Sequence, residues 1–375
     1  MKKIVFLTGT RADFGKLKSL IKITQESKLF EVHIFATGMH MNKMYGLTSD
    51  EIYKAGFHNI YPFVNHEKIE YMDRTLSKTI DGFSHYISQI EPDLIVVHGD
   101  RVETMAGAIV GSLNNILVAH IEGGEISGTI DELIRHSVSK MSHIHMVTNK
   151  EAQKRLIQLG ELDSSIFIIG SPDLDLMSSR NLPTLETAKN YYDIDFKDYA
   201  VAMFHPVTTE YDKIKVNIKS FIDALIESNK NYILIYPNND LGSMEILEEY
   251  KRIENHPKIK IFKSLRFEYF LKLLKNAKFM IGNSSAGIRE APYYKVPSID
   301  IGSRQNNRVV LDSIINCGYA KDVILEEIKN IKDIKDIKDS KEEFGDGNSN
   351  KLFLELLSRK DFWTIDRQKQ FQELK

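Results

Sequence analysis

The feature that most constrains the fold is an alternation between short apolar runs and longer amphipathic stretches. The runs KIVFL, EVHIFAT, DLIVVHG, ILVAHIE, IHMVT and IFIIG are apolar at consecutive positions and rich in β-branched residues. Strands that are apolar on both faces are typical of a parallel sheet covered by helices on both sides. Amphipathic stretches near residues 14–27, 101–114 and 150–159 lie between the runs. This order predicts a doubly wound α/β domain.

The same alternation starts again after a polar stretch that contains Pro172 and Pro183. The later runs are YAVAMFHP, YILIYPN, IKIFKS, FMIGNS and PSIDIG, with helices predicted near 212–228, 267–275 and 286–294. A second α/β domain of similar build is therefore expected.

The predicted domains are both Rossmann-like, and 375 residues are enough for two of them. The first covers residues 1–172 and is completed by a C-terminal helix over 360–375, and the second covers 180–355. Ligands of doubly wound domains bind beyond the carboxyl ends of the strands. We therefore expect the active site in a cleft between the two domains.

Composition and charge narrow the range of partners. The net charge is -2, so no nucleic-acid or membrane partner is predicted. The start, MKKIVFLTGT, has too short an apolar run for a signal peptide, and no run reaches the length of a membrane span. The single cysteine, Cys317, excludes an internal disulfide, and without an HExxH or cysteine-rich motif no metal site is predicted. A cytoplasmic protein is the interpretation that fits these features.

Acidic residues gather at the predicted strand ends of the first domain. Asp100 and Arg101 directly follow a buried run, Glu122 follows the next one, and Asp131 lies a few residues further on. Each acid alone is equally typical of a surface charge or a helix cap. Several carboxylates beside basic groups at the mouth of one sheet are what proton transfer needs, with one as base and another as acid.

Two segments combine glycine or serine with a predicted helix start. TGTRADFGKL places Arg11 and Lys16 after the first strand, and GNSSAGIREAP places Ser284, Ser285 and Glu290 after a strand of the second domain. The free N–H groups at a helix start can bind phosphate, but the serines can equally be plain helix caps. Neither segment has the GxGxxG or Walker A pattern.

Other polar residues occupy similar positions. His205, Asn238 and Asn239 end two strands of the second domain, and Arg308 lies in GSRQNNR after another. His136 lies at helical spacing after the acidic block. A histidine after a strand is either structural or part of a site.

Seven blocks together resemble the hydrolysing UDP-N-acetylglucosamine 2-epimerases of bacterial sialic-acid and legionaminic-acid pathways. They are TGTRADFGKL, HGDR, HIEGGEISGTIDE, GSPDLD, MFHPVTTE, GNSSAGIREAP and GSRQNNR, in order over about residues 1–310. The resemblance implies a glycosyltransferase-B-like fold, a UDP-sugar in the interdomain cleft, a homodimer, and no metal or redox cofactor. It implies that UDP-N-acetylglucosamine eliminates UDP to leave a 2-acetamidoglucal, and that water then adds to give N-acetylmannosamine.

The resemblance also implies roles for individual residues. Asp100, Glu122 and Asp131 would be the acid/base carboxylates, without a separate assignment of acid and base, and Arg101 would orient a carboxylate or the sugar. The remaining candidates would bind substrate: Arg11, His205, Ser284, Ser285 and Arg308 near the diphosphate, Glu290 at the ribose, Asn238 and Asn239 near the nucleotide, and Lys16 and His136 as further ligands.

Several alternatives remain open at this point. Non-hydrolysing 2-epimerases typically have HGDT where this chain has HGDR, and they lack the EGGEISGTIDE block, so the hydrolysing branch is favoured. UDP-2,4-diacetamido-2,4,6-trideoxyglucose, the legionaminic-acid precursor, differs only at C4 and C6, and residues 65–86 are a plausible place for that selectivity. A glycosyltransferase would need an acceptor groove, and a catalytically dead UDP-sugar sensor would not need the three carboxylates.

Overall fold

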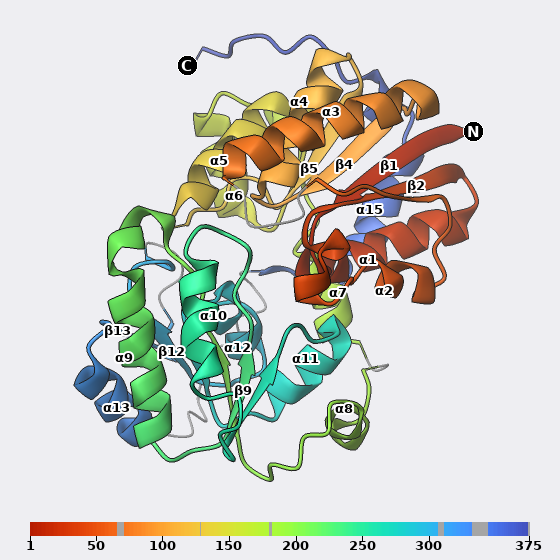
Figure 1. Ribbon diagram of the computed structural model, residues 1–375. Coiled ribbons are helices and arrows are strands. Elements are labelled where there is room, and N and C mark those ends of the chain that lie inside the picture. The colour runs from red at the N-terminus through yellow and green to blue at the C-terminus, as the bar shows by residue number, and fades with distance from the viewer. Residues whose placement is uncertain (66–70, 128, 180–181, 307–310, 332–343, 374–375) are drawn as a thin grey trace. The chain divides into compact units, whose positions relative to one another are not determined.

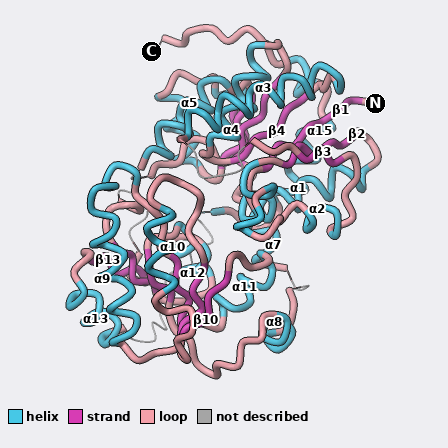
Figure 2. The backbone as a smooth tube through the Cα atoms, viewed as in Figure 1, coloured by secondary structure: helices cyan, strands magenta, loops and turns pink. Residues whose placement is uncertain are grey.

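The computed structural model divides the chain into two compact units, each described here by itself (Figures 1 and 2). Unit 1 comprises Met1–Glu125, Asp131–Ser179 and Lys341–Lys375, and unit 2 comprises Ile126–Ile130 and Arg180–Ser340. Within these units the described residues are 1–65, 71–127, 129–179, 182–306, 311–331 and 344–373.

Unit 1 is built on a parallel sheet that has seven strands among the described residues, in the order β3-β2-β1-β4-β5-β6-β7. The strands are β1 Lys2–Thr8, β2 Phe30–Ala36, β3 Ile60–Pro62, β4 Leu94–His98, β5 Leu117–Ile121, β6 Ile144–Val147 and β7 Ile166–Ile168. Every residue of β4 and β5 is buried, as expected for strands covered on both faces. The order reverses at β1, which lies between β2 and β4, so this is a doubly wound sheet.

Helices cover both faces of this sheet. They are α1 Arg11–Ser27, α2 Asp50–Lys54, α3 Met72–Ile90, α4 Val102–Leu113, α5 Ile130–Met141, α6 Lys150–Gln158, α7 Pro172–Met177 and α15 Ser349–Ser358. Ile4 and Phe6 of β1 pack in one core with Leu17 of α1. On the other face, Gly107 of α4 lets that helix approach Leu7 closely. In the part of the chain that the structure describes, no helix has both the length and the apolar character that crossing a bilayer requires.

Unit 2 repeats this build. Its parallel sheet has six strands among the described residues, in the order β10-β9-β8-β11-β12-β13. The strands are β8 Ala200–Met203, β9 Tyr232–Ile235, β10 Ile259–Phe262, β11 Met280–Gly282, β12 Ser298–Ile301 and β13 Ile314–Cys317. The helices are α8 Leu185–Tyr191, α9 Ile214–Glu227, α10 Ser243–Lys251, α11 Phe267–Lys275, α12 Glu290–Tyr293 and α13 Lys321–Asn330. The order reverses at β8, and the predicted doubly wound α/β class is confirmed.

The C-terminal segment differs from the predicted helix over 360–375. The helix of this region is α15, which packs against α1 in unit 1, with the ring of Phe353 centred 6.0 Å from that of Phe6 (Figure 1). The sequence predicts that residues up to 355, which include most of α15, belong to the second domain, whereas the structure assigns α15 to unit 1. Beyond α15 only a short 3-10 turn forms, at Asp361–Thr364, and residues 365–373 are not helical. The predicted helix is wrong because groups of this segment bond to other elements, as with the Arg367 carbonyl that accepts from His143.

The prediction of one continuous helix over 286–294 is also wrong. The segment is split into a 3-10 turn at Ser285–Gly287 and the single-turn helix α12. Pro292 has no N–H to donate to the carbonyl of Ile288, so the hydrogen bond that would join the two turns cannot form. Arg289, with φ -115° and ψ -68°, lies outside the regular helical range at the break.

Gly282, the last residue of β11, is expected to be essential for the stability of unit 2. Its φ is +132°, and a Cβ there would lie 1.8 Å from the carbonyl oxygen of Met203 in β8. Gly282→Ala should therefore lower the free energy of unfolding by about 2 kcal/mol or more, because it adds backbone strain and a clash that the neighbouring strand cannot relieve. Gly318→Ala is the matched control, since no atom lies within 4 Å of its added Cβ. Equal urea-unfolding midpoints for the two variants would contradict this reasoning.

Candidate active site

The loop after β1 satisfies its own backbone donors. Thr10 caps α1 by accepting from the N–H of Asp13, and the carboxylate of Asp13 accepts from the N–H of Gly9 at 3.0 Å. The guanidinium of Arg11 lies 3.7 Å from the carboxylate of Glu51. The N–H groups of Gly9 and Asp13 are thus already bonded within the loop, so a phosphate at this helix start would depend on other N–H groups and on the side chain of Arg11.

His98, the last residue of β4, is buried between two carboxylates. Its Nδ1 lies 2.9 Å from Asp13 and its Nε2 lies 3.2 Å from Glu122. Burial by itself lowers the pKa of this histidine, but Glu122 and Asp13 outweigh burial and raise the pKa to about 9. His98 is therefore a cation at neutral pH.

Glu122 directly follows β5 and lies at the centre of a cluster of charges. Its φ is +63°, a left-handed conformation that is uncommon outside glycine. One carboxylate oxygen accepts from the hydroxyl of Ser171, and the other lies 3.5 Å from the ammonium of Lys16. The same ammonium lies 3.4 Å from Asp173. We call these residues the Glu122 cluster: Asp13, Lys16, His98, Glu122, Ser171 and Asp173.

Asp100 follows β4 by way of Gly99, whose φ is +74°. Its carboxylate pairs with the guanidinium of Arg135 in α5. The side chain of Arg135 is 4% exposed and that of Asp100 is 25% exposed, so the acid is accessible while its partner is buried. Asp131 lies one helical turn before Arg135 in the same helix. The three predicted acid/base residues therefore lie on elements at one edge of the unit 1 sheet.

The other predicted residues of unit 1 face nearby acids. The Nε of Arg101 donates to the carboxylate of Glu103 at 3.2 Å, and Glu103 is almost fully buried. His136 lies 3.4 Å from Glu132, four residues earlier in α5. Asp100 is thus paired with Arg135, and Arg101 orients a different carboxylate.

In unit 2, His205 lies at the carboxyl end of β8 and is held by Asn283, which follows β11. The backbone N–H of His205 donates to the Asn283 side-chain oxygen at 2.6 Å, and the Asn283 amide donates back to the His205 carbonyl at 2.8 Å. The Nδ1 of His205 accepts from the backbone N–H of Asn238 at 3.0 Å. The neutral ring therefore carries its proton on Nε2, the form that donates to an anionic oxygen.

The remaining predicted residues of unit 2 lie near these strand ends. The amide of Asn238 donates to Asp240, and Asn239 lies next to it in the chain. The hydroxyl of Ser284 accepts from the N–H of Ala286 and caps the short turn that begins at Ser285. Glu290, in α12, is buried. Arg308 lies outside the described residues.

Two buried histidines, His143 and His145, have the spacing of a metal-binding pair, but their rings bond to protein groups. His145 contacts Glu161 at 2.9 Å, and His143 contacts the Arg367 carbonyl at 3.0 Å. Among the described residues, no group of three or more His, Cys, Asp or Glu side chains is arranged to hold a metal ion.

Sequence reasoning missed several members of the site. His98 lies in the motif block HGDR, and Ser171 and Asp173 lie in GSPDLD, but these residues were assigned no role. The available signal was position, because a polar residue that directly ends a buried parallel strand points to the ligand edge of the sheet. Asn283 carried the same signal.

The fold and these strand-end clusters together define the structural class of the protein. Two doubly wound parallel units in one chain, with polar clusters beyond their strand ends, form the glycosyltransferase-B-like class of α/β proteins. A structure of the Methanocaldococcus jannaschii UDP-N-acetylglucosamine 2-epimerase, solved with UDP-N-acetylglucosamine and UDP, has this fold. It matches with a TM-score of 0.81 at 22% identity, over 96% of this chain and 99% of that one.

Sequence comparisons then identify the family. The family model for UDP-N-acetylglucosamine 2-epimerase matches residues 22–358. A UDP-N-acetylglucosamine 2-epimerase of Neisseria meningitidis serogroup B is 47% identical, with 100% of both chains covered. A UDP-N,N'-diacetylbacillosamine 2-epimerase (hydrolyzing) of Legionella pneumophila is 35% identical, over 95% of this chain and 96% of that one. This chain is an enzyme of the UDP-N-acetylglucosamine 2-epimerase family, and membership of this family, which its motifs predicted, is confirmed.

The charge on His98 should make stability depend on pH. Its folded-state pKa of about 9 lies above the ordinary value of 6.5, so its contribution is complete below about pH 6.5 and is lost as the pH rises through 9. The rise of the pKa from 6.5 to about 9 corresponds to a loss on the order of 3 to 4 kcal/mol at most, at about 1.4 kcal/mol per pKa unit. Urea unfolding from pH 6 to 10 should show this decline in the parent, and His98→Asn should flatten it. His85→Asn, at an exposed position in α3, is the control and should keep the decline.

Proposed function

We propose that this enzyme is a hydrolysing UDP-N-acetylglucosamine 2-epimerase that releases UDP and N-acetylmannosamine. The hydrolysing branch is supported by the motifs HGDR and EGGEISGTIDE and by the 35% identical relative whose name includes the word hydrolyzing. The substrate is supported by the 47% identical relative named for UDP-N-acetylglucosamine.

The single observation that carries the proposal is the pairing of carboxylates with cations at the carboxyl edge of the unit 1 sheet. Asp100 is paired with Arg135, and Glu122 with His98 and Lys16. Such pairs orient carboxyl groups, and the proposed reaction needs a base and an acid beside the sugar ring.

The proposed first step is an elimination. One of Asp100, Glu122 and Asp131 takes the proton from C2, the electron pair forms the C1–C2 double bond, and the C1–O bond to UDP breaks. The 2-acetamidoglucal and UDP result. Because C2–H is weakly acidic, the negative charge that develops on the departing diphosphate must be stabilised while the proton leaves.

The proposed second step is the addition of water to the 2-acetamidoglucal. A protonated carboxyl group donates a proton to C2 from the opposite face, the hydroxyl of water bonds to C1, and the proton that this water loses passes to a carboxylate of the site. The sum is UDP-N-acetylglucosamine plus water giving UDP plus N-acetylmannosamine, with configuration changed at C2. Two acidic groups with different environments are needed, which is why more than one carboxylate is expected in the site.

Unit 2 is proposed to bind the nucleotide. His205, with its ring oriented by the backbone of Asn238, would donate from Nε2 to a diphosphate oxygen. Ser284 and Ser285 would add hydroxyl donors, with Arg11 and Arg308 as further cations and Glu290 at the ribose. Asn239 would lie near the nucleotide, and Arg101 and His136 would help position the sugar end of the substrate.

A second substrate has one observation in its favour. The Legionella relative is named for UDP-N,N'-diacetylbacillosamine, which is the 2,4-diacetamido-2,4,6-trideoxy sugar. The same two steps would apply, because the changes at C4 and C6 do not touch the reacting atoms. The higher identity to the Neisseria relative favours UDP-N-acetylglucosamine.

The biological setting follows from the proposed product. N-acetylmannosamine would serve nonulosonic (sialic) acid biosynthesis in the cytoplasm. The homodimer expected from the family resemblance stays a prediction, and sedimentation equilibrium of the full chain checks it.

Turnover in D₂O is the direct test of the proposed reaction. Purified enzyme with UDP-N-acetylglucosamine should give free UDP by phosphorus NMR and N-acetylmannosamine that carries deuterium at C2 by proton NMR. UDP-N-acetylmannosamine without release of UDP would instead identify a non-hydrolysing epimerase. Sugar transfer without exchange at C2 would identify a glycosyltransferase. Turnover of the 2,4-diacetamido sugar alone would reassign the substrate.

Asp100→Asn tests the acid/base assignment. We expect kcat to fall roughly 10²- to 10⁴-fold, because an amide cannot transfer the proton. The amide oxygen can still accept from Arg135, so UDP affinity measured by calorimetry should be close to that of the parent. Asp81→Asn, at an exposed position of α3, is the control and should be fully active. Near-normal turnover by Asp100→Asn would remove Asp100 from the mechanism.

A further inference from the structure

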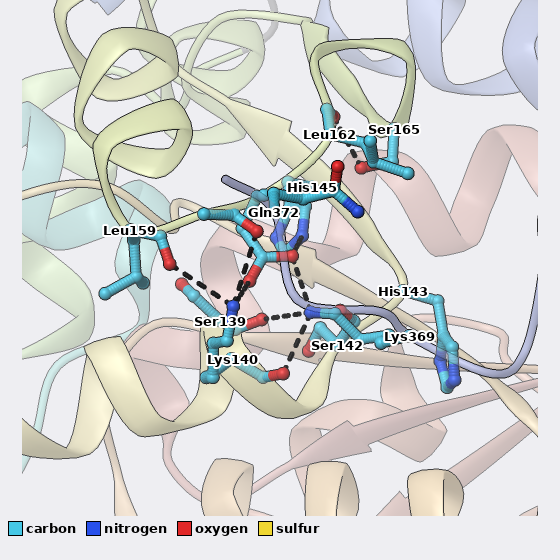
Figure 3. A network of polar contacts seen from close by, with 12 residues as sticks. Ser139, Lys140, Ser142, His143, His145, Leu159, Leu162, Ser165, Lys369 and Gln372 are labelled. Carbon is cyan, nitrogen blue, oxygen red and sulfur yellow. Dashed lines mark hydrogen bonds and ion pairs between the residues drawn. The ribbon is translucent and has the colours of Figure 1, made fainter. Parts of the chain in front are cut away.

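The C-terminal segment of the chain reaches back to the end of α5. The ammonium of Lys369 donates to the carbonyls of Ser139, Lys140 and Ser142 at 3.3, 2.8 and 2.6 Å (Figure 3). These carbonyls belong to the last turn of α5 and the residue that follows the helix, where carbonyls have no partner within the helix. A cation at this end also interacts favourably with the helix dipole. Lys369 therefore acts as a C-terminal cap supplied from more than 200 residues away in the chain.

The anchoring ammonium is itself held by a buried acid. Lys369 lies 2.5 Å from Glu161, whose side chain is 2% exposed. Glu161 also pairs with Lys140 at 3.0 Å and with His145 at 2.9 Å. Burial tends to raise the pKa of Glu161, but hydrogen bonds from His145 and Lys369 outweigh burial and lower it. The carboxylate is thus held as an anion, and it ties the C-terminal segment to β6 as well as to α5.

A second series of hydrogen bonds connects the last turn of α5 with the backbone next to Asp100. The hydroxyl of Ser139 lies 3.0 Å from Nδ1 of His120, and Nε2 of His120 lies 2.8 Å from the carbonyl of Gly99. A carbonyl only accepts, so Nε2 carries the proton and Ser139 donates to Nδ1. Burial lowers the pKa of His120 to about 3, which keeps the ring neutral. Both nitrogens are therefore used in fixing the turn that precedes Asp100.

These contacts connect Asp100 to α5 at two places. Arg135 binds the carboxylate of Asp100, and Ser139, one turn later, holds His120 and through it the carbonyl of Gly99. Ser139 is also one of the residues whose carbonyl Lys369 caps. The position of the acid is thus set by α5, and the end of α5 is set by the C-terminal segment.

We propose that Lys369 is a positioning residue for Asp100, acting through α5, Ser139 and His120. The inference rests on the proposed function, in which Asp100 is an acid/base carboxylate. An error of about 1 Å in the position of a reacting group can cost 10²-fold in rate, so a distant anchor is able to influence turnover.

Lys369→Met tests the anchor, because methionine keeps most of the chain length and removes the ammonium. We expect kcat to fall about tenfold, with UDP affinity unchanged, since the proposed nucleotide ligands of unit 2 are on other elements. Backbone hydrogen exchange of the full chain should become faster in the end of α5 and in residues 99–101, and should be unchanged in β8 and β9. Lys360→Met is the matched control: Lys360 is exposed, and among the described residues its ammonium makes no hydrogen bond or ion pair.

His120→Gln and His120→Asn test the link to Asp100. A glutamine amide can reach the position of Nε2 and donate to the Gly99 carbonyl, whereas an asparagine amide reaches only the position of Nδ1. The glutamine variant should keep most of the parent kcat, and the asparagine variant should lose at least as much as Lys369→Met. The pH profile of kcat should be the same for His120→Gln and the parent, because a positioning residue does not exchange the proton.

The outcomes separate the inference from the proposed function. A parent enzyme that turns over no UDP-sugar would refute the proposed function, and hydrogen exchange alone would then decide whether Lys369 orders residues 99–101. Parent-like kcat and parent-like exchange at 99–101 in Lys369→Met would overturn the inference. Equal losses of kcat in the two His120 variants would also overturn it. The disappearance of one limb of the pH profile of kcat in His120→Gln would do the same. If Lys369→Met does not fold, the two His120 variants decide whether the inference stands.

Discussion

The parallel pairing of β4 with β5 is the constraint on which the candidate site depends. In this register His98 lies opposite Ile121, so the residues that follow the two strands emerge side by side at the carboxyl edge of the sheet. Glu122 is thereby placed 3.2 Å from His98, and Asp100 follows two residues later. A slip of one residue would exchange the side chains that pack on the two covered faces of either strand, so close packing of the core favours this register and with it the geometry of the site.

Burial of these charges is tolerated because each is paired. An isolated carboxylate in the interior would be strongly destabilising, whereas here the acids of the Glu122 cluster face His98 and Lys16, and Asp100 faces Arg135. Removing one partner would leave a buried charge without compensation. The cluster therefore couples the stability of unit 1 to the protonation state of the groups that the proposed chemistry needs.

The strand ends of the two units each hold polar side chains in fixed orientations. Unit 1 gathers buried ion pairs, and in unit 2 hydrogen bonds among His205, Asn238 and Asn283 orient the candidate nucleotide ligand His205. Ion pairs suit proton transfer, and oriented neutral donors suit the binding of a diphosphate. Under the proposed function the acid/base groups would belong to unit 1, and the nucleotide ligands, apart from Arg11, would belong to unit 2.

The sequence by itself determined the α/β class, most helix and strand positions, the family and the strand-end location of the candidate residues. These follow from apolar periodicity and contiguous motifs, which are local properties of the chain. Only the tertiary structure decided that His98 lies between Asp13 and Glu122, that Asp100 pairs with Arg135, and that the C-terminal segment caps α5 without forming a helix beyond Thr364. Each of these depends on residues that are distant in the chain and meet through sheet register and helix packing, and no local pattern carries that information.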